Sequence, residues 1–203
     1  YTQRPFGPHV GRTTIPEDLI NKLNKYVDEI ILDKEKGKIQ NHGKHLVGNV
    51  AQEFILENKF MEECGWGEFL GQEVSHWIHS STGKKISKFN LMNSWIVRQF
   101  QNEYNPLHFH NGHVSGVGYL KVPKNFGETF QKDKKANLNG KIQLVHGSHH
   151  FLSKSQLTIT PKVGEFYFFP NYLMHTVYPF YNDNEERRSI SFNAYIDNDI
   201  YEF

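Results

Sequence analysis

The chain has 203 residues, the length of one domain, and its hydrophobic fraction of 37% is enough to fill one core. With 23 Lys and Arg against 22 Asp and Glu, the formal charge of +1 gives no strong field, which excludes nucleic acid and anionic membranes as expected partners. The single cysteine, Cys64, excludes an internal disulfide and a cysteine-based zinc site, and no apolar run approaches the roughly 20 residues of a spanning helix. We expect one domain over 1–203, with a polar N-terminal segment over 1–14 that is not a secretory signal.

The first part of the chain, about 15–85, is predicted to be helical support for a core that follows it. Pro16 has the position of a first-turn proline after two threonines. Apolar residues then recur at helical spacing, and a second stripe predicts a helix over about 66–80. The first stripe comprises Leu19, Ile20, Leu23, Tyr26, Val27, Ile30 and Ile31, and the second Trp66, Phe69, Leu70, Val74, Trp77 and Ile78. Both stripes are best explained as core packing.

The second part, about 91–197, is predicted to be strands. Runs rich in β-branched and aromatic residues alternate with clusters of Gly, Pro, Asn and Asp. The expected strands are 93–101, 114–122, 141–145, 163–169 and 188–196. Helices first and short strands afterwards favour a mainly β fold, a double-stranded β-helix (jelly roll) with N-terminal helices packed on one sheet.

A long polar, lysine-rich segment over 123–140 interrupts these strands. A loop of that length is either functional or disordered. We expect it to lie over the mouth of a site, and a solvated insertion is the alternative.

Histidine is the unusual residue type, with 12 in the chain. In the segment Asn-Pro-Leu-His-Phe-His-Asn-Gly-His, over 105–113, His108 and His110 are two residues apart, so an extended backbone places both on one face. His113 has odd spacing from His110 and would point elsewhere. Each histidine alone is more simply explained as a surface or core residue.

A distant histidine completes the pattern. An apolar strand breaks at Pro170 and is followed by His175, which we expect at the start of a turn held by that strand. Together, His108, His110 and His175 predict a metal site.

The strand near the C-terminus has two different faces. One face carries Arg188, Ile190, Phe192, Ala194 and Ile196, and the other carries Arg187, Ser189, Ser191, Asn193 and Tyr195. We expect the apolar face to pack under the helices and the polar face to look into the barrel. A guanidinium there could bind a carboxylate through two hydrogen bonds, and a neighbouring hydroxyl could donate a further hydrogen bond. A register shift of one residue would exchange Arg187 for Arg188, and both arginines could instead lie in solvent.

From about 93 to 196, the chain resembles the 2-oxoglutarate/Fe(II) dioxygenase superfamily. It is most similar to a subfamily of 2OG-Fe(II) oxygenases that has a His-x-His motif and is related to the prolyl hydroxylases. The helical N-terminal part resembles the superfamily only in being helical, without matching motifs. The matching stretches are 108–110, 115–120, 122–123, 164–166, 169–175 and 187–193.

The resemblance implies Fe(II), O₂ and the co-substrate 2-oxoglutarate. The implied reaction couples oxidative decarboxylation of 2-oxoglutarate to succinate and CO₂ with hydroxylation of a second substrate. It assigns the three histidines to the metal, and Arg187 with Ser189 to the distal carboxylate of the co-substrate. Tyr119 stands where prolyl hydroxylases have a tyrosine that binds this carboxylate, and core packing is its alternative. Asn193 and His113 are weaker candidates.

His110 departs from the superfamily pattern, in which a carboxylate stands at this position. Three neutral imidazoles leave the iron one negative charge short, and the same set binds zinc and nickel well. The His-x-His pattern occurs within the subfamily that the chain resembles. Alternatively, His113 is recruited in place of His110, or no third protein ligand is needed.

Two other functions remain open. A cupin-type dioxygenase with three histidines explains His110 but leaves Arg187 without a role, and a non-catalytic jelly-roll module that binds a sugar or peptide leaves the histidines incidental. For the oxygenase, we expect a small-molecule or peptide substrate, such as a peptidyl residue or amino acid. We expect the cytoplasm of a microbe, or of a virus-infected microbial host, as its location. The oligomeric state is not predicted.

Overall fold

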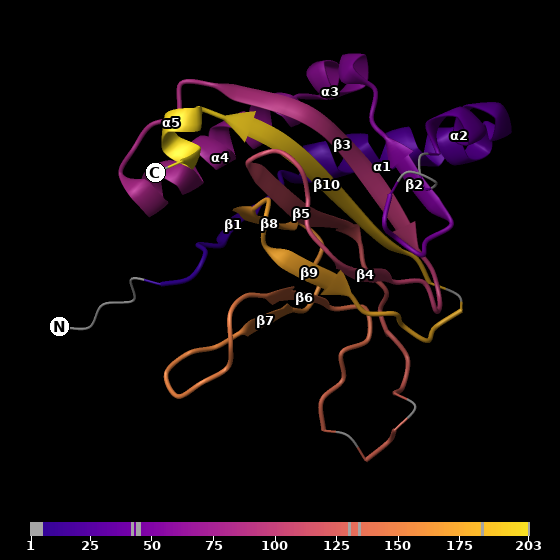
Figure 1. Cartoon of the computed structure of the whole chain (residues 1–203). Helices are drawn as coiled ribbons and strands as arrows, with labels where there is room; N and C mark the ends of the chain where they lie inside the picture. The colour runs from indigo at the N-terminus through magenta and orange to yellow at the C-terminus, as the bar shows by residue number, and fades with distance from the viewer. Residues whose placement is uncertain are drawn as a thin grey trace.

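The structure is a computed structural model that describes residues 6–41, 43, 46–129, 131–133, 135–183 and 185–202. The first five residues of the polar N-terminal segment thus lie outside the described residues. Two antiparallel sheets form the core of the molecule, and helices cover one of them (Figure 1). This arrangement is the predicted one, a mainly β fold with N-terminal helices on one sheet.

The larger sheet has six strands in the order β1-β8-β5-β10-β3-β2, and the smaller has four in the order β4-β9-β6-β7. In sheet order, the six are β1 (Gly11–Thr14), β8 (Glu165–Pro170), β5 (Val114–Lys121), β10 (Arg187–Ile196), β3 (Phe89–Gln99) and β2 (Gln52–Ile55). The four are β4 (Asn105–His108), β9 (Met174–Val177), β6 (Ile142–Val145) and β7 (Gln156–Ile159). The helices are α1 (Glu17–Leu32), α2 (Lys34–Gln40), α3 (Asn58–Cys64), α4 (Trp66–Thr82) and α5 (Asn198–Tyr201).

Helices α1, α3 and α4 lie along the face of the larger sheet that is turned away from the smaller sheet (Figure 1). The buried side chains of α1 and α4 all belong to the predicted stripes, but Phe69 and Trp77 of the second stripe are only partly buried. Pro16 precedes the first helical residue rather than occupying the first turn, and Ile31 is 36% exposed because it lies one residue beyond the buried face. Within the described part of the chain, no helix is long and apolar enough to cross a membrane.

Strand β10 separates two cores by the alternation of its side chains. Ile190, Phe192, Ala194 and Ile196 pack with the helices, as predicted from their shared face. A second apolar cluster joins β5 and β8 to the smaller sheet, and it includes Tyr119 and Phe169. On the polar face of β10, Arg187, Ser189 and Ser191 therefore look into the space between the two sheets. Tyr195, which was expected on the same inward face, is 42% exposed instead.

Two glycines of β5 let an aromatic ring pack closely on this sheet. A Cβ atom at Gly116 would lie 2.6 Å from the rings of Phe166 and Phe192, and one at Gly118 would lie 2.2 Å from Phe166. Any side chain at either position would displace these buried rings. The glycines of β5 are thus required by the packing of the helical layer rather than by a turn.

The long loop between β5 and β6 does not lie where we expected. Its described residues contact the segment that follows β9: Phe126 packs edge-on against Phe180, and its carbonyl oxygen accepts a hydrogen bond from the backbone N–H of Tyr181. None of these residues lines the pocket that contains the histidines. The expectation that this loop covers the mouth of the site is wrong for the described part of the loop.

Candidate metal centre

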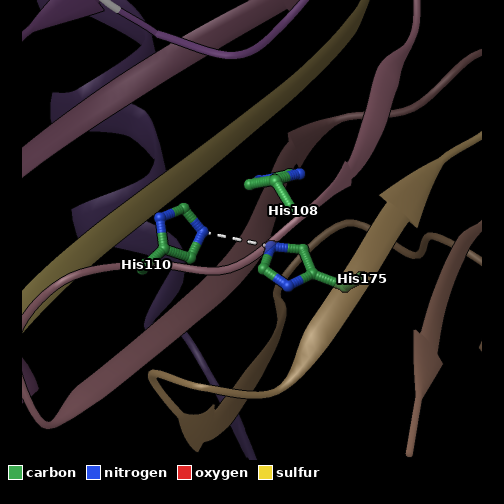
Figure 2. A group of neighbouring side chains, drawn as sticks. All are labelled: His108, His110 and His175. Carbon is green, nitrogen blue, oxygen red and sulfur yellow. Dashed lines mark hydrogen bonds between the residues drawn. The ribbon is translucent and has the colours of Figure 1, made fainter.

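The three predicted histidines meet between the sheets, as Figure 2 shows. One ring nitrogen from each of His108, His110 and His175 lies within 4.8 Å of the others, which is the separation that a shared metal ion allows. His108 is the last residue of β4 and pairs with His175 of β9 across the antiparallel ladder. His175 thus lies within a short strand, not at the start of a turn as predicted, because β9 begins soon after the break at Pro170.

His110 lies just beyond the end of β4 and is held there by Asn171. The backbone N–H of His110 donates to the carbonyl oxygen of Asn171 at 3.0 Å, and the side-chain amide of Asn171 donates back to the His110 carbonyl oxygen at 3.2 Å. This reciprocal pair keeps the segment extended past the strand. His108 and His110 therefore share a face, as their two-residue spacing predicts.

Two of the histidines have a fixed tautomer. The Nδ1 atom of His108 lies 2.7 Å from the carbonyl oxygen of Pro106, and that of His175 lies 2.8 Å from the carbonyl oxygen of Leu173. Because a carbonyl only accepts, Nδ1 carries the hydrogen in both rings and Nε2 keeps its lone pair. Histidines that ligate metals are commonly oriented by such a second hydrogen bond. The Nε2 atoms of His110 and His175 face each other at 3.1 Å (Figure 2).

Burial keeps all three imidazoles neutral. It lowers the pKa of His108, and it lowers the pKa of His110 to about 3 and that of His175 to about 4, with the neighbouring histidines adding to the shift. A neutral imidazole is the form that binds a metal. The cluster is therefore in its ligating state without any loss of protons at neutral pH.

The histidines line a pocket of about 430 Å³, a volume that includes solvent at its mouth. The wall combines apolar side chains from both sheets with a few polar groups. It is lined by Trp95, Val97, Asn105, His108, His110, Gly116, Val117, Ile142, Phe169, His175, Val177, Arg187, Ser189 and Ser191. The structure thus brings Arg187 and Ser189 into one pocket with the three histidines.

Arg187 is buried, with 1% of its surface exposed, and its charge is not compensated. Its Nη1 donates to Oε1 of Gln99 at 3.1 Å and to Oγ of Ser189 at 3.4 Å, whereas Nε and Nη2 have no partner. Among the residues that the structure describes, no carboxylate lies within 4.0 Å of this guanidinium. Burial lowers its pKa, but an arginine keeps its proton in proteins. An unpaired buried cation is unfavourable unless an anion joins it.

Tyr119 lies beside this arginine. The carbon at the centre of the Arg187 guanidinium is 5.1 Å from the centre of the Tyr119 ring, and the Tyr119 hydroxyl is buried without a hydrogen-bond partner. Burial raises the pKa of this hydroxyl, so it stays a neutral donor. Two kinds of unused donor, a guanidinium edge and a phenol, thus lie next to each other.

Arg188 points the other way. Its guanidinium bonds to Asp28 at 2.7 Å and to Glu186 at 2.7 Å, and it also donates to the side chain of Asn24. The alternative register, with Arg188 in the pocket, is wrong, and so is the alternative that both arginines lie in solvent, because each is 1% exposed.

The two weaker candidates lie elsewhere. His113 stacks on Tyr201 with ring centres 4.0 Å apart, and its Nδ1 lies 3.2 Å from the backbone of Ile196, so it is not recruited to the cluster in place of His110. Asn193 accepts a hydrogen bond from Ser115 at 2.8 Å and does not line the pocket.

Sequence analysis missed three polar or aromatic neighbours of the site: Trp95, Gln99 and Asn105. Trp95 lies 5.6 Å from the ring of His110, Asn105 lines the pocket, and Gln99 holds Arg187. The alternation along β3 puts Trp95, Val97 and Gln99 on one face, which was a usable signal. Their side chains carry no charge, so only the pairing of β3 with β10 shows what they contact.

A sequence profile of the 2OG-Fe(II) oxygenase family matches residues 93–193. This range runs from β3 into β10 and contains every residue that lines the pocket. Among curated proteins, no sequence matches the chain.

Solved structures with low sequence identity share the fold. A prolyl-4-hydroxylase of Pseudomonas putida is 15% identical, with a TM-score of 0.58 and 91% of each chain covered. The viral collagen prolyl hydroxylase of Paramecium bursaria Chlorella virus-1, solved as a 2-oxoglutarate complex, is 14% identical, with a TM-score of 0.53 over 91% of this chain and 94% of that one. A prolyl hydroxylase from Trichoplax adhaerens, solved with a peptide fragment of the hypoxia inducible factor oxygen degradation domain, is 13% identical, with a TM-score of 0.53 over 97% and 86%. These similarities confirm the predicted jelly roll.

Proposed function

Because the chain belongs to the family of 2-oxoglutarate- and iron(II)-dependent oxygenases, we propose that His108, His110 and His175 hold its iron and that Arg187 binds its co-substrate. Enzymes of this family use Fe(II), 2-oxoglutarate and O₂. When bound, the iron supplies the oxidative decarboxylation of 2-oxoglutarate and the coupled hydroxylation of the substrate.

The donor set fits a divalent metal ion. Three neutral imidazoles converge from β4, the segment after it, and β9, and two of them have their Nε2 lone pairs fixed by backbone carbonyls. The histidines add no negative charge, so a divalent ion here keeps its full charge toward an anionic ligand. In the proposed site, this favours a keto acid at the metal.

The buried, uncompensated charge of Arg187 is the observation that carries the proposal. Its free Nε and Nη2 form one edge of the guanidinium, and such an edge binds a carboxylate through two parallel hydrogen bonds. Ser189 and Tyr119 supply hydroxyls beside it. In the proposed complex these groups bind the distal carboxylate of 2-oxoglutarate, while the apolar wall of Val117, Phe169 and Val177 keeps water away from it.

The test is co-substrate turnover with added Fe(II). We expect O₂-dependent formation of succinate from 2-oxoglutarate by the native chain, and a loss of at least two orders of magnitude in Arg187→Ala, since a bidentate charged contact contributes roughly 3 kcal/mol. Equal succinate formation by both proteins would remove Arg187 from the site.

The three-histidine set favours one second candidate, a cupin-type dioxygenase that does not use 2-oxoglutarate. That function gives Arg187 no task and leaves its charge buried without an anion. Oxygen consumption that requires Fe(II) but is unaffected by 2-oxoglutarate, with no succinate released, would support it over our proposal.

For the substrate, we propose a peptidyl residue or an amino acid. The support is the shared fold with prolyl hydroxylases, one of which was solved with a peptide. Leu107 and Phe109, which flank His108, are 52% and 60% exposed and offer apolar contacts beside the metal centre. Stimulation of succinate formation by a library of proline-containing peptides, compared with free amino acids, would separate the two substrate classes.

A further inference from the structure

Gln99 is a buried amide at the end of β3, opposite Arg187 in the ladder between β3 and β10. Only 1% of its surface is exposed. Its side-chain amide makes hydrogen bonds to three polar atoms: the carbonyl oxygens of Glu103 and Tyr178, and Nη1 of Arg187. A buried amide with this many hydrogen bonds has one defined orientation.

That orientation follows from the backbone. The Nε2 atom of Gln99 donates to the carbonyl oxygens of Glu103 at 2.5 Å and Tyr178 at 3.2 Å. Carbonyl oxygens cannot donate, so this end of the side chain must be the NH₂ group, and Oε1 must face Arg187. Oε1 then accepts from Nη1 of Arg187 at 3.1 Å.

The bond to Gln99 decides which edge of the guanidinium is available. Nη1 is occupied by Gln99 and Ser189, and the adjacent pair Nε and Nη2 is left free. Gln99 is neutral, so it fixes the guanidinium without cancelling its charge. A carboxylate in the same place would pair with Arg187 and compete with any anion in the pocket.

We infer that Gln99 is a positioning residue that presents the Nε–Nη2 edge of Arg187 to the distal carboxylate of the co-substrate, and thereby selects 2-oxo dicarboxylates over 2-oxo monocarboxylates. This inference rests on the function proposed above, in which Arg187 binds that carboxylate. A 2-oxo acid without a distal carboxylate makes no use of the guanidinium, so its binding does not depend on Gln99.

The test compares two ligands of equal chain length: 2-oxoglutarate, and 2-oxopentanoate, which has a methyl group in place of the distal carboxylate. Binding is measured by calorimetry without oxygen on the chain loaded with Mn(II). We expect Gln99→Met to weaken 2-oxoglutarate about tenfold, since a hydrogen bond to a charged group is lost, and to change 2-oxopentanoate by less than about twofold.

Gln143→Met is the matched control. Gln143 is also a buried amide, bonded to Thr158 and Tyr178, but it contacts neither Arg187 nor the pocket. We expect this variant to leave the preference between the two ligands unchanged. If Gln99→Met fails to fold, Gln99→Leu replaces it, since its side chain is likewise neutral and accepts no hydrogen bond from Arg187, and it should weaken 2-oxoglutarate with the same selectivity.

Equal weakening of both ligands in Gln99→Met, or of neither, would overturn the inference. Arg187→Met, measured in parallel, separates this failure from that of the proposed function. If Arg187→Met loses the preference for the dicarboxylate and Gln99→Met keeps it, only the role of Gln99 is refuted. If Arg187→Met also keeps the preference, the carboxylate site itself is refuted.

Discussion

Arg187 and Arg188 are neighbours with the same side chain and the same 1% exposure, yet their surroundings are opposite. Arg188 looks toward α1 and bonds to Asp28 and Glu186. Burial alone would raise the pKa of Glu186, but hydrogen bonds from Arg98 and Arg188 outweigh this and hold its pKa below the usual value. Arg187 looks into the pocket, and no described carboxylate pairs with it. One side of β10 thus has its charges balanced within the fold, and the other side has a buried positive charge with no described carboxylate beside it.

The largest expected effect is on ligand binding. Arg187→Met should weaken 2-oxoglutarate by about 100-fold or more, and Arg188→Met should leave its affinity unchanged, because only Arg187 faces the pocket. Calorimetric titration of both variants measures this directly. Comparable losses of 2-oxoglutarate affinity in the two variants would contradict the assignment of Arg187 alone to the pocket side of β10.

For the free energy of unfolding, we expect the larger loss in Arg188→Met rather than in Arg187→Met. Arg188→Met leaves Glu186 with Arg98 and Asp28 with Lys121 as their remaining ion-pair partners among the described residues. It should lower the free energy of unfolding by roughly 2 kcal/mol, less than for a buried carboxylate that loses its sole partner. Arg187→Met removes a buried charge that has no counter-ion and should leave this free energy equal or higher. Urea denaturation of both variants, without metal or co-substrate, gives the comparison. A larger loss of unfolding free energy in Arg187→Met than in Arg188→Met would contradict this order.

A smaller effect is expected at the end of the pocket that is lined by the three histidines. His110→Ala should lower the affinity for Fe(II) or Mn(II) by roughly tenfold or more, since one of three ligands is lost, and His110→Asp should restore or exceed the native affinity because a carboxylate adds charge. Competition with a fluorescent chelator measures both. Native affinity in His110→Ala would show that this histidine does not bind the metal.

The smallest expected effect is the dependence of the stability of the fold on pH. Burial lowers the pKa of His110 to about 3 and of His175 to about 4, whereas unfolded histidine titrates near 6.5. Between about pH 6.5 and pH 4, the unfolded chain takes up protons that the metal-free fold does not, so the stability contributed by the neutral rings is complete above pH 6.5 and is lost as the pH falls. The melting temperature of His110→Gln should therefore fall less between pH 7 and pH 5 than that of the native chain. Equal decreases in melting temperature in the two proteins would show that His110 does not cause the pH dependence.

The two faces of β10 were predictable from the sequence because alternation along one strand is a local property. Alternation alone predicts that the side chain of Arg187 points toward the pocket and that those of Ile190 and Phe192 point toward the helices, as the structure has them. The spacing of His108 and His110 worked for the same reason. Strands β1, β2, β4, β7 and β9 were missed, since each has only four residues and gives too few positions for a periodic signal. Strand β6 is equally short but was predicted, because three of its four residues are apolar.

What depends on distant pairing could not be predicted. The turn expected at His175 is a strand because Met174–Val177 finds partners in both β4 and β6. Gln99 gives no signal on its own, because a neutral amide takes its role from Glu103, Tyr178 and Arg187. The loop over 123–140 was placed at the site by its length and charge, which say nothing about the surface that it contacts.

The ladder between β4 and β9 has a consequence for the dynamics of the protein. β4 is a four-residue strand at the edge of the smaller sheet, where amide hydrogens exchange readily with solvent. His108 and His175 lie opposite each other across this ladder, so an ion held by both side chains is a cross-link between the edge strand and its neighbour. Loading the site with metal should slow deuterium uptake at residues 105–108 and 174–177, and the edge of the barrel would then open only as fast as the ion leaves.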